Sequence, residues 1–154
     1  MLTAVAACLC AGALALPADL SAAGEVHASA CTVLGTPKAD VLVGTNRADT
    51  ICAFGGSDRI RARGGNDIIF GGSGSDRIDA GNGRDHVYAA QGNDRLVGGK
   101  GNDVLRAGAG KDKVTSADQR RDSVFGGKGS DRARADRVDS LSSVEVVTRP
   151  RKKR

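Results

Sequence analysis

The sequence predicts a single-domain repeat protein assembled from nine-residue units and held together by something other than a large apolar core. Aspartate recurs every nine residues from Asp40 to Asp112 without a slip, and an aliphatic residue follows each aspartate after two positions. Aromatic residues make up only 3% of the 154 residues, and the chain contains no tryptophan. Because a compact globular core needs large apolar side chains, the alternatives are a repeat fold or a disordered chain.

Each unit has a fixed pattern around its aspartate. Glycine lies two positions before the aspartate in seven successive units, from Gly56 to Gly110, and the best units are GGSGSDRID at 71–79 and GGKGNDVLR at 98–106. Glycine permits positive φ angles, so such a turn can direct carbonyl groups inward around a cation, and aspartate adds a hard carboxylate oxygen. Oxygen donors without histidine or cysteine favour Ca²⁺ over zinc or copper.

These units make the chain resemble the RTX (repeats-in-toxin, haemolysin-type) calcium-binding family, whose signature is this glycine- and aspartate-rich nonapeptide. The resemblance covers residues 35–134, most of the chain after its apolar N-terminus. It implies an all-β fold, a right-handed parallel β-roll with two short sheets and calcium in the turns. Each unit would make a six-residue turn and a three-residue strand, and two units would complete one coil.

Two units per coil stack residues that are eighteen apart, so the aspartates form two columns, one at each edge of the roll. The resemblance implies that neighbours in a column share calcium ions, with turn carbonyls completing each shell, although an isolated aspartate is usually a solvated turn residue. One aliphatic column per sheet cannot offset the chain entropy, so we expect folding to be coupled to calcium binding. The expected ligands are Asp58, Asp76, Asp94 and Asp112 in one column, Asp67, Asp85 and Asp103 in the other, and, with less support, Asp131.

The pattern weakens towards both ends of the repeat region. The first two units carry Lys38 and Arg47 where glycine is expected, so they are predicted to form a capping coil in which Asp40 and Asp49 are doubtful ligands. A later unit has no glycine and is one residue too long, which predicts weak or absent binding at Asp122.

The N-terminal run LTAVAACLCAGALAL has the length of a signal-peptide core and is too short for a comfortable membrane span. No lysine or arginine precedes it, and an uncleaved anchor helix or a lipid-attached cysteine remain as alternatives. The expected organisation is a signal peptide at 1–28 cut near Ala28, a disulfide-tied cap with a degenerate first coil at 29–52, a calcium-binding roll at 53–134 (best at 53–115), a capping strand at 135–148, and a basic disordered tail at 149–154.

Cleavage would remove Cys8 and Cys10 and leave Cys31 and Cys52. Two cysteines in an oxidising compartment usually pair, so a disulfide is expected, with two free thiols as the alternative. Such a bridge would stabilise the fold by about 3 kcal/mol.

Residues on either side of each inward aliphatic point outward, so the stacking predicts two unlike sheet faces. One face is basic, and in a chain of net charge +5 it either binds an anionic cell-surface polymer or offsets the aspartates and keeps the protein soluble. The other is apolar, and is either a partner or self-association surface or simple cross-strand packing. The basic face carries Arg59, Arg77, Arg95 and Lys113, and the apolar face carries Ile68, His86, Val104, Phe70, Tyr88 and Arg106.

The chain offers little catalytic equipment. His86 is the one histidine left after cleavage, and no nucleophile elbow, HExxH motif or phosphate-binding loop is present. We therefore expect a secreted calcium-binding structural or binding module and not an enzyme. The alternatives are an attachment protein that docks on anionic polymers, at the cell surface, and a detached module of a secreted enzyme. Specific nucleic-acid binding is not expected, because stacking aromatics are nearly absent; the oligomeric state stays open.

Overall fold

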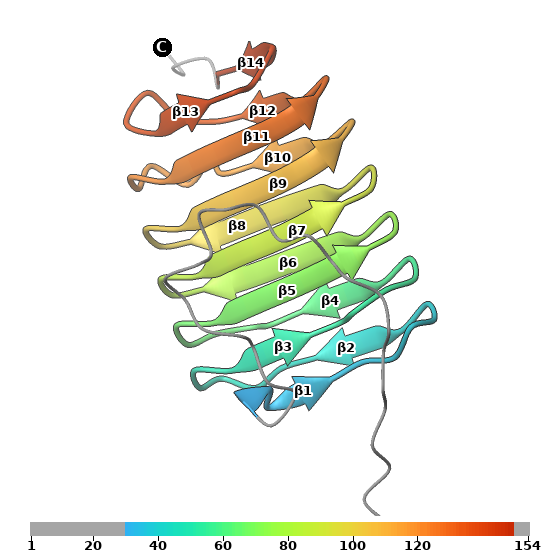
Figure 1. Ribbon diagram of the computed structural model, residues 1–154. Coiled ribbons are helices and arrows are strands. Elements are labelled where there is room, and N and C mark those ends of the chain that lie inside the picture. Colours follow the sequence, from blue (N-terminus) through green and yellow to red (C-terminus); the bar gives the residue numbers. More distant parts are fainter. Residues whose placement is uncertain (1–29, 150–154) are drawn as a thin grey trace, which may run out of the picture.

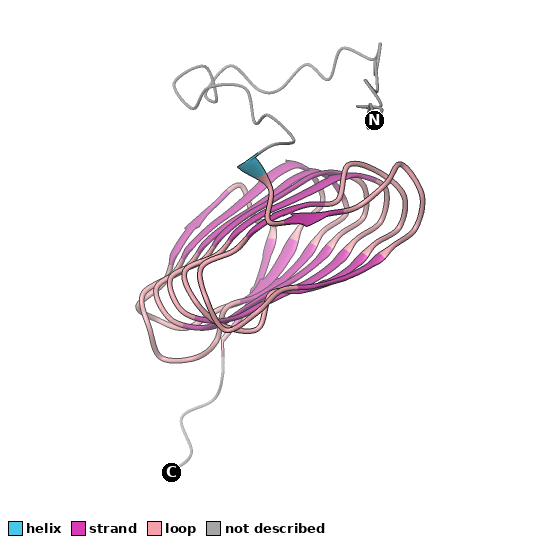
Figure 2. Cartoon of the chain, turned by 90° about the horizontal axis from the view of Figure 1, so that it is seen from below, coloured by secondary structure: helices cyan, strands magenta, loops and turns pink. Residues whose placement is uncertain are grey.

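The computed structural model describes residues 30–149, which form a flattened solenoid of two parallel β-sheets (Figures 1 and 2). Each sheet has seven strands, and the chain alternates between the sheets, so that all odd-numbered strands form one sheet and all even-numbered strands form the other. We call them the odd sheet and the even sheet. The odd sheet contains β1 (Val33–Leu34), β3 (Thr50–Cys52), β5 (Ile68–Ser73), β7 (His86–Gln91), β9 (Val104–Gly110), β11 (Ser123–Gly129) and β13 (Ser140–Ser142). The even sheet contains β2 (Val41–Val43), β4 (Arg59–Arg61), β6 (Arg77–Asn82), β8 (Arg95–Lys100), β10 (Lys113–Thr115), β12 (Arg132–Arg134) and β14 (Val146–Thr148).

The strand register confirms the predicted stacking of residues eighteen apart. Ile69 pairs with Val87 in the odd sheet, and Ile78 pairs with Leu96 in the even sheet. The predicted parallel β-roll with two units per coil is therefore correct. The extra residue between Asp112 and Asp122 changes the step to nineteen for one coil, after which the aliphatic column continues.

The core lies between the two sheets and contains no aromatic side chain among the described residues. Aliphatic residues such as Ile69 and Leu96 are fully buried in it, as predicted. The prediction of one inward column per sheet is too simple, however. A second inward column consists of the first residue of each unit, because most central strands are six or seven residues long and side chains alternate along a strand. Its buried members that carry a side chain are Ala53, Ala62, Ala80, Ala89, Ala107, Ser116 and Ala135.

The coils approach one another most closely at the glycine two positions before each aspartate. Gly83 has a φ of +135°, and a Cβ atom placed on it would lie 1.6 Å from the carbonyl oxygen of Gly65 in the preceding coil. Glycine is therefore required for two reasons, the left-handed backbone and the contact between coils. This explains why the glycine recurs in seven successive units.

The two ends of the roll are closed differently. At the N-terminal end, the predicted disulfide joins Cys31 to Cys52, with their Cα atoms 6.0 Å apart. At the C-terminal end, the stretch 135–148, predicted as a capping strand, contains two strands, β13 and β14, so that the two-strand coil continues to the end. Leu141 pairs with Val124, and Leu141 and Val144 add partly buried aliphatic side chains to the core.

The expected signal peptide at 1–28 and most of the expected basic tail, residues 150–154, lie outside the described residues. Arg149 is described, and its guanidinium donates a hydrogen bond to the carbonyl oxygen of Asp136. Between residues 30 and 149, no helix has the length and apolar character needed to cross a membrane.

Substitution of the coil-contact glycine tests this account of the fold. Gly83→Ala is expected to destabilise the calcium-loaded protein by about 1–3 kcal/mol from the strained φ alone, with the clash adding to it. Gly64→Ala is the matched control, because its Cβ atom would meet only ordinary contacts from 3.6 Å outward, so that its effect should stay within about 1 kcal/mol. Urea unfolding in calcium measures both, and equal losses would contradict the proposed contact.

Candidate calcium-binding turns

The aspartates of the repeat lie at the ends of the turns, immediately before the strands, and form two columns along the edges of the roll. Consecutive members are linked by a hydrogen bond in which the backbone N–H of one aspartate donates to the Oδ1 atom of the aspartate one coil later. Asp76 N–H donates to Asp94 Oδ1 and Asp67 N–H to Asp85 Oδ1, both at 2.8 Å. The two predicted columns are thus present, with their members in the predicted order.

Both columns are longer than the seven aspartates expected as ligands. One begins at Asp40 and runs through Asp131 to Glu145, and the other begins at Asp49 and runs through Asp122 to Asp139. The turn before Asp122 accommodates its extra residue, and Gln119 has a φ of +73° there although it is not glycine. The sequence signal for this continuity is Val124, which restores the aliphatic position two residues after Asp122.

In nine of these residues, the other carboxylate oxygen is buried without a hydrogen-bond partner. An ionised oxygen in this state loses its hydration and gains nothing in exchange, so it is strongly unfavourable unless a cation faces it. The residues with a buried, unpartnered Oδ2 atom are Asp58, Asp67, Asp76, Asp85, Asp94, Asp103, Asp112, Asp122 and Asp131. This set contains all seven expected ligands, the further candidate Asp131, and Asp122.

Burial raises the pKa of most of the column aspartates, and the raised values are highest at Asp94 and Asp122. Burial, together with the neighbouring carboxylates of Asp112 and Asp76, raises the pKa of Asp94 to about 7 against the lowering effect of the Asp76 N–H. Burial likewise raises the pKa of Asp85 and of Asp103 to about 6. Without a cation, these columns therefore hold protons far more tightly than a solvated aspartate does.

The residues present fit a calcium ion. Calcium prefers carboxylate and carbonyl oxygens and tolerates irregular geometry, and both donor types are concentrated in these turns. Within residues 30–149, no group of three or more histidine, cysteine, aspartate or glutamate side chains converges on one point. Most of each shell would therefore come from the backbone carbonyls of the turns, as expected from the sequence, and the aspartates would supply the charge.

The outer face of the even sheet carries the predicted basic ladder. Its side chains are exposed and aligned by the strand register, one per strand, at a spacing of about 4.8 Å. The ladder consists of Arg59, Arg77, Arg95, Lys113 and Arg132, the last of which the sequence analysis did not include. Among the described residues the one salt bridge joins Arg61 to Asp79 at 3.9 Å, so the cations of the ladder are unpaired.

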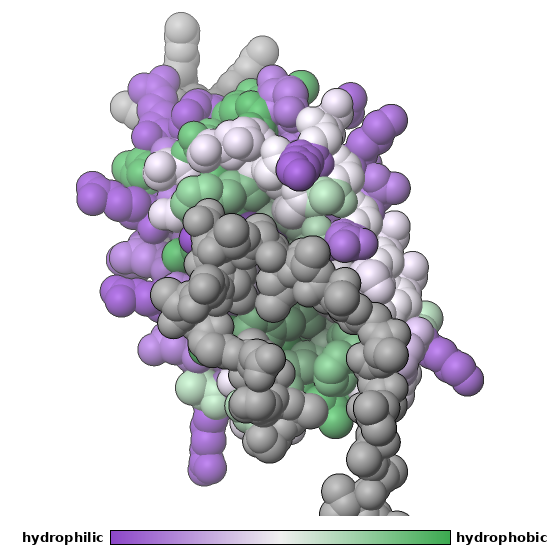
Figure 3. Space-filling view, in the orientation of Figure 1, coloured by the Kyte–Doolittle hydropathy of each residue, from purple (hydrophilic) through white to green (hydrophobic). Residues whose placement is uncertain are grey.

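The outer face of the odd sheet carries three of the four aromatic residues of the chain, Phe70, Tyr88 and Phe125. Phe70 and Tyr88 stack with their ring centroids 5.2 Å apart, and the Arg106 guanidinium lies between Tyr88 and Phe125, 4.8 Å from the centroid of Phe125. Where this face is in view, Figure 3 shows mainly apolar and weakly polar residues, with hydrophilic residues along its edges. The predicted grouping of Ile68, His86 and Val104 beside this stack is confirmed by the strand register.

Comparison with known families agrees with this geometry. The family model for the RTX calcium-binding nonapeptide repeat, which spans four copies of the repeat, matches residues 34–69, 53–87 and 88–120. These matches run together over more than half of the chain. No curated protein and no solved structure shows significant similarity to this chain. The matched residues contain all seven expected ligands, and the chain therefore belongs to the family of RTX calcium-binding nonapeptide repeat proteins.

Proposed function

We propose that this protein is an extracellular module that folds when its turns bind calcium and then presents the outer faces of its sheets to partners. The observation that carries this proposal is the set of nine buried Oδ2 atoms without a partner. Their burial opposes folding while they are ionised and unpaired, and calcium binding converts the same atoms into a stabilising contact.

The composition of the core supports coupling between folding and calcium. The hydrophobic core consists of aliphatic residues and alanines, so each coil buries little apolar area for the number of residues it orders. Ligand binding to the folded state alone adds stability by mass action, by about 4 kcal/mol at a thousandfold excess over the dissociation constant for each site. Several sites along two columns can therefore decide whether the chain folds.

Two features support an extracellular location. RTX repeats are typical of secreted proteins, where millimolar calcium is common, and the Cys31–Cys52 disulfide is of the kind that persists in oxidising compartments. The proposed role is binding without catalysis. His86 lies on the outer face of the odd sheet in register with Ile68 and Val104, which offer it no partner for acid–base chemistry.

A second candidate function is attachment to an anionic polymer at the cell surface, and the unpaired basic ladder favours it. Five cations in a straight row on a flat sheet can contact successive negative groups of an extended chain such as an acidic polysaccharide. Because the row exists only when the strands are in register, such binding would itself depend on calcium.

Circular dichroism tests the coupling of folding to calcium. In EDTA the full chain with its disulfide should lack most of its β signal, and added Ca²⁺ should restore it cooperatively, whereas Mg²⁺ at the same concentration should not. A β spectrum that is the same in EDTA and in calcium would contradict the proposed function.

The raised pKa values predict that increasing pH lowers the stability of the metal-free folded chain but increases its affinity for calcium. Between the ordinary aspartate pKa of 3.8 and the raised values near 6 and 7, the folded metal-free chain binds more protons than the unfolded chain. Its stability is therefore present in acid and lost as the pH rises through about 6–7. Calcium affinity should instead increase over the same range, because protons compete with calcium. Titrations at about pH 5 and pH 8 measure both trends, and an affinity that does not change with pH would contradict the assignment.

Co-sedimentation with an acidic polysaccharide tests the basic ladder. The triple variant Arg59→Ala, Arg77→Ala, Arg95→Ala should bind at least tenfold more weakly than the native protein, and native binding should fall as salt increases. The matched control Arg84→Ala, Lys100→Ala, Arg121→Ala removes the same charge outside the ladder and should bind nearly as well as the native protein. Equal losses in both variants would reject the ladder as the binding surface.

A further inference from the structure

The aspartate columns contain two kinds of turn. From Asp58 onward, every turn up to Asp131 leaves an Oδ2 atom buried without a partner, but the first two turns do not. Their sequences are GTPKAD at 35–40 and GTNRAD at 44–49, with threonine as the second residue. The hydrogen bonds made by this threonine distinguish the first two turns from the later ones.

Each threonine closes its turn through two hydrogen bonds to one carboxylate oxygen. The backbone N–H of Thr45 donates to Asp49 Oδ2 at 2.6 Å, and its hydroxyl donates to the same atom at 2.8 Å. Thr36 makes the same two contacts with Asp40 Oδ2, again at 2.6 and 2.8 Å. These donors occupy the oxygen that is left unpartnered in the later turns.

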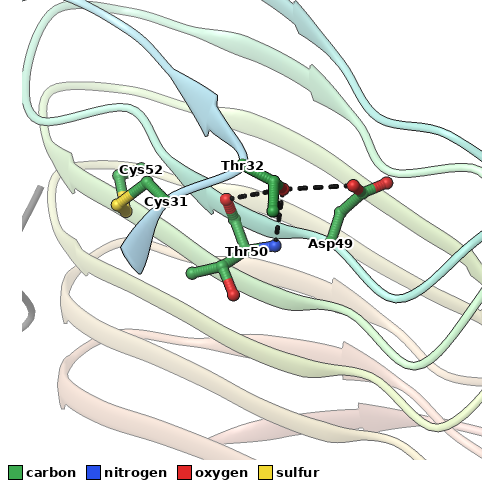
Figure 4. Close-up of a disulfide and its surroundings, with 5 residues drawn as sticks. All are labelled: Cys31, Thr32, Asp49, Thr50 and Cys52. Atoms are coloured by element: carbon green, nitrogen blue, oxygen red, sulfur yellow. Dashed lines mark hydrogen bonds between the residues drawn. A yellow bond between two sulfur atoms is a disulfide. The ribbon is translucent and has the colours of Figure 1, made fainter. Parts of the chain in front are cut away.

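The second carboxylate oxygen of Asp49 is satisfied as well. The hydroxyl of Thr32 donates to Asp49 Oδ1 at 3.1 Å, and the same hydroxyl accepts the N–H of Thr50 at 2.9 Å (Figure 4). Thr32 follows Cys31, whose disulfide to Cys52 holds this first strand against β3. Asp49 therefore has donors on both oxygens although it is almost fully buried, with 7% of its surface exposed.

The backbone explains why threonine changes the turn. The second residue of the units beginning at residues 53 to 107 has a positive φ whether or not it is glycine, for example +70° at Phe54, +81° at Arg63 and +99° at Gly72. Thr36 and Thr45 do not have a positive φ. A β-branched side chain is strongly disfavoured there, so threonine selects the other conformation, in which its N–H faces the carboxylate.

The charge state of the carboxylates follows the same division. The N–H of Thr45 lowers the pKa of Asp49 below its ordinary value, whereas burial raises the pKa of Asp67, its neighbour in the same column. The hydrogen bonds to Asp49 thus favour its anionic form, whereas burial disfavours the anionic form of Asp67. The two residues are linked directly, since the N–H of Asp49 donates to Asp67 Oδ1 at 2.8 Å.

We propose that Thr36 and Thr45 take the place of calcium in the first two turns, so that residues 31–52 form a metal-independent end cap. The calcium-binding columns then begin at Asp58 and Asp67. This inference rests on calcium binding by the later turns. The two threonines would therefore determine which turn is the first to bind calcium. Asp40 and Asp49 would not be ligands because threonine donors occupy their Oδ2 atoms, and not only because their turns lack a glycine.

A pair of matched variants tests the proposal. Asp49→Asn and Asp67→Asn change neighbouring carboxylates of one column, and the number of calcium ions bound to each full-length, disulfide-bonded protein is measured by equilibrium dialysis and native mass spectrometry. Asp67→Asn should bind fewer ions than the native protein, and Asp49→Asn should bind the native number with native affinity. Loss of calcium from Asp49→Asn would overturn the proposal, whereas a native protein that binds no calcium would instead reject the proposed function.

A gain-of-site variant tests the role of threonine directly. Thr45→Gly with Arg47→Gly converts GTNRAD into GGNGAD, which has both glycines and the aspartate of the later turns. This variant should bind more calcium than the native protein, and Arg47→Gly alone should not, because Thr45 would still close the turn. A folded double variant with the native ion count would contradict the claim that threonine excludes the ion.

Discussion

The structure depends on the different roles of the two carboxylate oxygens in each repeat aspartate. One oxygen accepts the backbone N–H of the aspartate one coil earlier, as Asp94 does from Asp76 at 2.8 Å, and this contact ties successive coils together at both edges of the roll. From Asp58 to Asp131, the other oxygen is buried in the turn, where the protein supplies no donor. The contact that builds the columns thus also creates the need for a cation.

The remaining features of the roll follow from this arrangement. The coils must approach closely for the aspartates to stack, and only glycine fits where the carbonyl oxygen of Gly65 reaches the next coil at Gly83. The space between the sheets is narrow, and it is filled by one aliphatic residue and one small residue from each unit. Large aromatic side chains have no place inside, and Phe70 and Tyr88 stack on the outer face of the odd sheet instead.

Much of the fold could be predicted because a strict period determines which residues stack. The step of eighteen predicts the two aspartate columns, the basic ladder and the apolar face. The Cys31–Cys52 pair could be predicted because these are the two cysteines that remain after the expected cleavage. The inward alanines were missed because they follow from the length of the strands, and the period does not specify strand length. The place of Asp122 in its column was missed because a lengthened turn can absorb its extra residue, which depends on the backbone conformation at Gln119. The closure by Thr45 depends on φ and on hydrogen-bond direction, which no spacing rule describes.

The central claim is that the unpartnered Oδ2 atoms of the two columns bind calcium, and crystals grown in calcium test it most directly. An anomalous difference map should show peaks beside Oδ2 of the column residues from Asp58 and Asp67 onward, spaced by one coil, and no peak beside Asp40 or Asp49. A folded roll with ordered columns and no anomalous peak beside these oxygen atoms would contradict the account.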